Sequence, residues 1–84
     1  MDELNPDKIY WHSRRGMLEL DLLLVPFARE VFVTLSHQEQ MLYKEFLGEE
    51  DQDIYSWLLE RTEPPNSAFK PLIERILAHK AAWT

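Results

Sequence analysis

The sequence predicts an all-α fold, a compact bundle of five short helices that forms a single domain over residues 1–84. Prolines, glycines and capping residues divide the 84 residues into short segments. Within most segments, apolar residues recur at the three- and four-residue spacing of an amphipathic helix. Only residues 18–22 alternate in the manner of a strand, so no competing β pattern extends along the chain.

The first helix is expected to begin at Pro6, because Asn5 is a good N-cap and proline suits the first helical position. Gly16 is expected to end it by adopting a positive φ, which glycine tolerates best. Arg14 and Arg15 would then lie in the last turn, where cations complement the helix dipole.

The second helix is expected to start near Met17. We favour a helix over a strand because the alternation at residues 18–22 gives way to a continuous apolar run of strong helix formers. Pro26 should kink this helix or split it into two segments. Residues 32–34 favour β-structure and leave the end of the helix undefined.

The remaining three helices are marked by their ends. Ser36 and Glu39 have the spacing of a capping box, which opens the third helix, and Gly48 is expected to end it. The acidic run at residues 49–53 suits the start of the fourth helix. Pro71 belongs to the first turn of the fifth.

Composition excludes several classes of protein. A net charge of −6 argues against general nucleic-acid binding, and the absence of cysteine excludes disulfides, thiolate metal sites and cysteine nucleophiles. No apolar run approaches the length of a membrane span, so we expect no direct membrane insertion. The acidic N-terminus does not resemble a secretory signal, which makes a cytoplasmic protein the simplest inference.

The usual constellations of catalytic residues are missing. His12, His37 and His79 do not share a helical i, i+3 or i, i+4 spacing, so we expect no metal site. Glu19 and Asp21 are two residues apart and would point away from each other on a helix, which is unsuitable for an acid–base pair. We therefore expect no catalytic residues and no enzyme. Most aromatic residues, Phe46 and Trp57 among them, are expected in the core.

The segment Arg14–Glu19 allows two interpretations. Residues 8–18 contain no acid, so the turn sits in a small basic region of an acidic chain. In the structural interpretation, Arg14 and Arg15 complement a helix end, while Glu19 reaches back to free N–H groups or pairs with Arg15. In the functional interpretation, the fixed charges face a partner. Local physics leaves both open.

Two blocks of residues resemble the SdhE (YgfY) family, bacterial relatives of the mitochondrial succinate dehydrogenase assembly factor. Residues 9–21 contain the R-G-x-x-E signature as Arg15-Gly16-Met17-Leu18-Glu19. Residues 51–58 match D-x-D-[IL]-[YF]-x-W, and Pro26-Phe27 and Leu35-Ser36 fall between the blocks at the expected places. The resemblance covers most of residues 8–60, whereas residues 62–84 agree only in general character.

The resemblance implies an assembly factor, or chaperone, for a flavoprotein. Such proteins bind the flavoprotein subunit of succinate dehydrogenase, and of fumarate reductase in some bacteria, and promote covalent attachment of FAD to it. Carried over to this chain, the partner-binding residues are Arg14, Arg15, Gly16, Met17 and Glu19. The FAD would belong to the client, with no cofactor or metal held by the chain itself; direct FAD binding stays open.

Two other classes of function stay open beside this one. The chain can be a helical protein-interaction module of another kind, such as the antitoxin of a toxin–antitoxin pair. It can also be a small enzyme acting through Glu19 and Arg15, which would require both side chains in an enclosed pocket. In the favoured case we expect a monomer.

Overall fold

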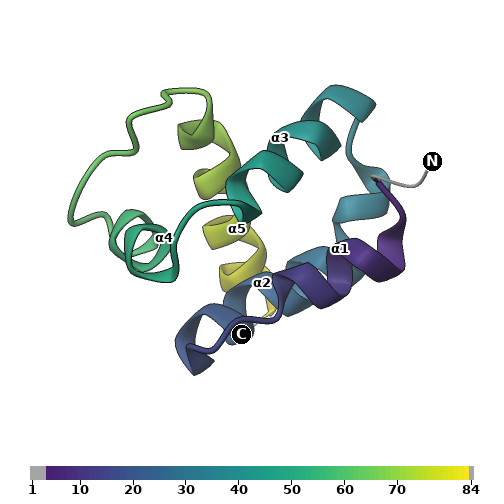
Figure 1. The fold of residues 1–84 in the computed structure, drawn as a ribbon, viewed down its shortest axis with the longest axis horizontal. Helices are drawn as coiled ribbons and strands as arrows, with labels where there is room; N and C mark the ends of the chain where they lie inside the picture. Colours follow the sequence, from purple (N-terminus) through teal and green to yellow (C-terminus); the bar gives the residue numbers. More distant parts are fainter. Residues whose placement is uncertain (1–3, 84) are drawn as a thin grey trace.

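Five α-helices account for most of the chain in the computed structural model, which describes the backbone of residues 4–83 and the side chains of residues 4–79 (Figure 1). The helices are α1 (Pro6–Ser13), α2 (Leu18–Glu30), α3 (His37–Leu47), α4 (Asp51–Leu58) and α5 (Phe69–Trp83). A short 3-10 helix, η1 (Phe32–Thr34), follows α2. Residues 4–83 contain no strand, so the prediction of an all-α bundle of five helices is confirmed.

Helices α2 and α5 are the centre of the bundle. Helix α2 packs against α1, α4 and α5, and α5 also contacts α3 and α4. Figure 1 shows α1 and α2 side by side, joined by a turn at one end of the molecule. This turn carries residues 14–17, the segment that the sequence marks as the candidate site.

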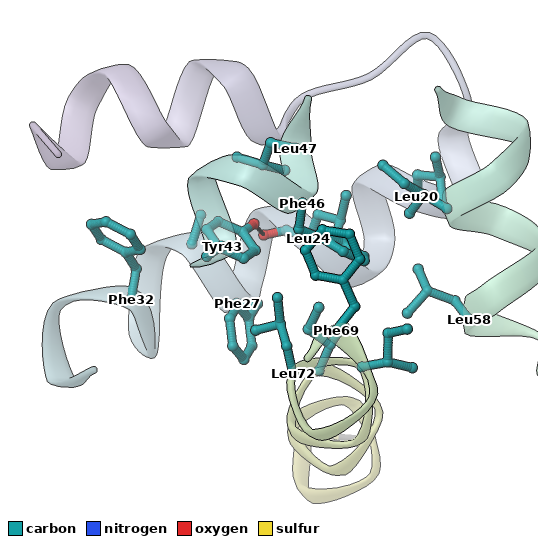
Figure 2. Packing of buried hydrophobic residues seen from close by; sticks show 14 of the residues in the cluster. Leu20, Leu24, Phe27, Phe32, Tyr43, Phe46, Leu47, Leu58, Phe69 and Leu72 are labelled. Atoms are coloured by element: carbon teal, nitrogen blue, oxygen red, sulfur yellow. Dashed lines mark hydrogen bonds between the residues drawn. The ribbon is translucent and has the colours of Figure 1, made fainter. Parts of the chain in front are cut away.

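The core is built largely of aromatic side chains. Figure 2 shows Phe27, Tyr43, Phe46 and Phe69 gathered beside α5. The ring centroids of Phe27 and Tyr43 lie 5.3 Å apart, and those of Phe46 and Phe69 lie 5.3 Å apart in an edge-to-face arrangement. Such pairs each add about 0.5–1.5 kcal/mol beyond the burial of apolar area. Phe46 and Trp57 are both buried, which confirms their predicted place in the core.

The predicted N-terminal caps are confirmed. The Asn5 side chain accepts a hydrogen bond from the backbone N–H of Asp7 at 2.8 Å, at the start of α1. At the start of α3, the Ser36 hydroxyl accepts from the N–H of Glu39 at 3.2 Å. The Glu39 carboxylate accepts from the N–H of Ser36 at 3.0 Å in return, which completes the capping box.

Helix α2 runs through Pro26 as one element, so the helix is not split there. Leu24 and Phe27 on either side of Pro26 are fully buried. Their packing offsets the hydrogen bond that proline cannot donate. The β-favouring residues 32–34 form η1 instead of a strand.

The prediction that Gly16 adopts a positive φ is wrong, because neither glycine does. The chain leaves α1 through Arg14 in an extended conformation (φ −81°, ψ 125°), so no left-handed residue is needed. The left-handed residue is Glu60, with φ 59°, directly after α4. The N–H groups of Glu60 and Arg61 donate to the carbonyls of Trp57 and Ser56 at 3.0 and 2.9 Å, which is a Schellman motif.

Candidate functional site

The α1–α2 turn is held at both ends by backbone hydrogen bonds. The N–H of Arg14 donates to the carbonyl of Trp11 at 3.2 Å and closes α1. Met17 is the N-cap of α2, where its carbonyl accepts from the N–H groups of Leu20 and Asp21 at 3.1 and 3.2 Å. The turn therefore has a fixed path between two helices.

The Arg15 side chain turns inward and joins separate parts of the chain. Its Nε donates to the Asp51 carboxylate at 2.7 Å, and the two residues form an ion pair. Its Nη1 donates to the carbonyls of Leu47 at 2.8 Å and His12 at 3.1 Å, and its Nη2 donates to the carbonyl of Glu49 at 2.9 Å. Only 12% of this side chain is exposed, so most of the guanidinium is used inside the protein.

These acceptors explain why an arginine is suited to this position. His12 and Leu47 lie in the last turns of α1 and α3, where backbone carbonyls lack partners within the helix. Asp51 lies in the first turn of α4, where the helix dipole stabilises a carboxylate. One guanidinium thus ties the ends of α1 and α3 and the start of α4 to the turn before α2.

Neither contact that the structural interpretation offers Glu19 is formed. Among residues with described side chains, Glu19 makes no ion pair with Arg15 and no capping hydrogen bond. The reason is that other carboxylates take these roles: Asp51 pairs with the Arg15 side chain, and Asp21 accepts from the Arg15 backbone N–H at 2.5 Å. Glu19 is left exposed in the first turn of α2.

A buried pair of hydroxyl groups anchors the end of α1 just before the turn. The Ser13 hydroxyl donates to the carbonyl of Ile9 at 2.8 Å and lies 2.8 Å from the Tyr43 hydroxyl. The Tyr43 hydroxyl is also 3.4 Å from the carbonyl of Leu24. Burial raises the pKa of Tyr43, although the Ser13 hydrogen bond and the Arg15 charge partly oppose this. Helices α1, α2 and α3 therefore meet directly behind the turn.

The outward face of the turn consists of other residues. Arg14, Gly16 and Glu19 are exposed, whereas Met17 is partly buried against the core. The Arg14 guanidinium lies 5.5 Å from the centroid of the Trp11 ring, at cation–π distance. The turn thus presents a positive and a negative charge on either side of a glycine.

Two large apolar side chains beside the turn are exposed to solvent, which their helical spacing does not predict. Trp11 is 64% exposed and Leu18 is 68% exposed. In the sequence, Trp11 follows Ile9 and Tyr10 as an apolar residue of the first helix, and Leu18 occupies a variable position of R-G-x-x-E. The polar residues around them were the only available signal, and helical spacing alone did not separate this face from the core.

Space around Gly16 is open. A Cβ atom built on Gly16 would meet no heavy atom within 4 Å. Neither its φ angle nor packing in the free protein therefore requires glycine here. A requirement for glycine would have to come from something that approaches the turn.

The site has few features of a metal or acid–base centre. Partial burial, followed by the charges of Arg15 and Lys44, lowers the pKa of His12 and favours its neutral form. The described residues contain no group of three or more potential metal ligands. Among the described side chains, the Arg15 guanidinium pairs with Asp51 and not with Glu19, whose carboxylate is exposed.

None of the helices in the described part of the chain has the length and apolar character needed to cross a bilayer.

Comparison with known proteins identifies the family. A family model described as Sdh5, "Flavinator of succinate dehydrogenase", matches residues 7–80. Proteins named FAD assembly factor SdhE are similar over most of their length. The one from Pseudomonas aeruginosa is 45% identical over 90% of each chain, and the one from Pseudomonas putida is 49% identical over 89% of this chain and 87% of its own. The one from Coxiella burnetii is 41% identical over 89% of this chain and 92% of its own. The chain therefore belongs to the Sdh5 family, whose bacterial members include the FAD assembly factors SdhE.

Proposed function

We propose that this protein binds the flavoprotein subunit of succinate dehydrogenase and promotes covalent attachment of FAD to it. The flavoprotein subunit of fumarate reductase would be a second client, to which FAD is attached in the same way. Membership of the family supports the proposal, since its relatives are named as FAD assembly factors. The structural observation that carries it is the α1–α2 turn, which is fixed from behind by Arg15 and exposes Arg14, Gly16 and Glu19.

The protein acts on the client by positioning and is not an enzyme. The client would supply the chemistry: its histidine would bond to a flavin methyl carbon, which gives up a proton, and the electron pair of that C–H bond would reduce the flavin ring. A helper then needs only to hold the client in a conformation where flavin and histidine are in line, which can supply several kcal/mol of the barrier. A turn with a fixed path and fixed charges suits this task better than a mobile loop, because less entropy is lost on binding.

The individual residues would contribute in different ways. Arg14 and Glu19 would provide charge complementarity with the client, and Gly16 would let the client approach the backbone closely. Met17, which packs partly against the core, would anchor the turn and present the exposed part of its side chain to the client. Arg15 belongs to the partner-binding residues because its side-chain hydrogen bonds would fix the turn.

The FAD belongs to the client in this proposal. A hollow of about 560 Å³ beside α3 is lined by one lysine, Lys44, and two glutamates, Glu39 and Glu45, so its lining offers a pyrophosphate no net positive charge. Neither glycine lies in a phosphate-binding loop pattern. We therefore propose a cytoplasmic monomer that meets FAD only in its client and binds no nucleic acid.

Co-expression with a succinate dehydrogenase flavoprotein subunit tests the proposal. Covalent flavin is read as in-gel fluorescence of the denatured subunit, with and without this protein. Gly16→Arg and Glu19→Ala should reduce the signal, and both should fold because their side chains point into open space. Ala78→Arg and Glu74→Ala are matched controls at exposed positions of α5 and should keep the signal.

Unchanged covalent flavin with folded Gly16→Arg would refute the role of the turn. No dependence of covalent flavin on the protein would refute the function itself. Capture of an unrelated toxin from cell extract, without a flavoprotein, would favour the antitoxin alternative.

A further inference from the structure

We propose that Asp51, in the second sequence block, is a positioning residue for client binding that acts through Arg15. Asp51 would hold Arg15, and Arg15 would hold the exposed turn in its binding conformation. This inference rests on the proposed function, and it assigns separate roles to residues that the sequence motif presents as one set.

The geometry limits what Arg15 can offer a partner. A guanidinium has five N–H donors. The bonds to Asp51, Leu47, His12 and Glu49 occupy one donor at Nε, two at Nη1 and one at Nη2. A single Nη2 donor is left, on a side chain that is 12% exposed. Arg15 therefore cannot form the two-pronged contact with a client carboxylate for which arginine is best suited.

Asp51 differs from the other acceptors of the Arg15 guanidinium in carrying a charge. The other three acceptors are backbone carbonyls. Removing the Asp51 charge would leave a largely buried cation without a counter-charge, which is strongly unfavourable. The guanidinium would be expected to move toward solvent and to release the carbonyls of Leu47 and Glu49.

The backbone of the turn would then have one anchor fewer. Arg15 is held through its side chain by Asp51 and through its N–H by Asp21, so carboxylates from α4 and α2 act on the same residue. Without the first of these, the turn keeps only local contacts to α1 and α2. A turn that samples several conformations binds its client more weakly, because only a fraction of molecules is competent.

Asp53 provides a matched control. It lies in the same first turn of α4, is exposed, and forms no ion pair with the residues whose side chains are described. Asp51→Asn and Asp53→Asn remove the same charge from the same helix end. Only Asp51→Asn removes the charged partner of the Arg15 guanidinium.

Two measurements test the proposal. Because the chain has no cysteine, Leu18→Cys places a single nitroxide label on the exposed start of α2. Asp51→Asn should increase the mobility of this label in the free protein, and Asp53→Asn should not. Asp51→Asn should also raise the Kd for the client flavoprotein subunit about tenfold, the size expected for one charge-assisted hydrogen bond. Both are measured well below the melting temperature, where a loss of stability alone would not change affinity.

The proposal is overturned if the label spectrum or the client Kd of Asp51→Asn matches that of Asp53→Asn. If Asp51→Asn does not fold, Arg15→Lys replaces it, because lysine keeps the charge but cannot reach the carbonyls and Asp51 together. Arg15→Lys should then give the mobile label, and an unchanged spectrum would count against the proposal. If the unsubstituted protein binds no flavoprotein, the proposed function fails, while the label still decides whether Asp51 holds the turn.

Discussion

Replacing Ser13 by alanine should destabilise the protein more than replacing Tyr43 by phenylalanine, although each change removes one hydroxyl group. Ser13 is fully buried and donates to the carbonyl of Ile9. With the Ser13 hydrogen used there, we take Tyr43 as the donor in the 2.8 Å contact between the two hydroxyls, in preference to its longer 3.4 Å contact with the carbonyl of Leu24. The two substitutions leave different groups without partners.

The magnitudes follow from these partners. Tyr43→Phe removes a hydrogen bond but leaves Ser13 bonded to Ile9, so we expect a loss of about 1 kcal/mol. Ser13→Ala leaves the Tyr43 hydroxyl buried, with only the carbonyl of Leu24 at 3.4 Å as an acceptor. A buried hydroxyl with so poor a partner costs about 2 kcal/mol. The double variant should lose less than the sum, because no orphaned hydroxyl remains.

Urea denaturation followed by tryptophan fluorescence measures these free energies, with a melting-temperature shift of about 4–8 °C for each kcal/mol as a check. The predicted order of the free energy of unfolding, from highest to lowest, is wild type, then Tyr43→Phe, then Ser13→Ala. Equal losses for the two single variants would refute the reasoning. So would a double variant that loses the full sum, because the hydroxyls would then act independently.

Three further substitutions test other features of the fold. Ser36→Ala should lower the unfolding free energy by about 1 kcal/mol by removing the cap of α3, measured by urea denaturation. Glu60→Gly should raise the free energy of unfolding by roughly 1 kcal/mol, and with it the melting temperature, because glycine adopts the left-handed φ of 59° without strain. The His12 pKa is lowered in the folded state, so the unfolded state binds more protons below the ordinary value of 6.5. Stability should therefore fall as pH drops from 6.5 toward the folded pKa, and His12→Asn should weaken this pH dependence in urea titrations at several pH values.

Local signals predicted most helix boundaries correctly. Asn5-Pro6 and the Ser36–Glu39 box act within four residues, so their hydrogen bonds are encoded in adjacent sequence. The acidic start of α4 is equally local. These features were recoverable because the interacting atoms are brought together by the helix itself.

The two glycines differ in how well they predict the backbone. Gly48 caps α3 as expected, with φ −77°. Gly16 was expected to supply a left-handed turn, but the one left-handed residue among those described is Glu60. Helix α1 can end in an extended conformation because Arg15 supplies donors to the carbonyl of His12 from outside the helix. The need for a left-handed cap thus depends on a side chain whose own position is set by α3 and α4, which local patterns do not contain.

The same non-local contacts change what the Arg15-Gly16-x-x-Glu19 pattern means. From sequence, Arg15 and Glu19 look like a charged pair, since they are four residues apart. In the folded protein, Arg15 contacts Asp51, which is 36 residues away, and Glu19 faces solvent. A pattern of adjacent residues therefore combines an inward residue, which contacts α3 and α4, with outward residues that face solvent. Loss of function on substituting Arg15 would not show that it touches the client, and only a comparison with Asp51 and Glu19 separates fixing the turn from contacting the partner.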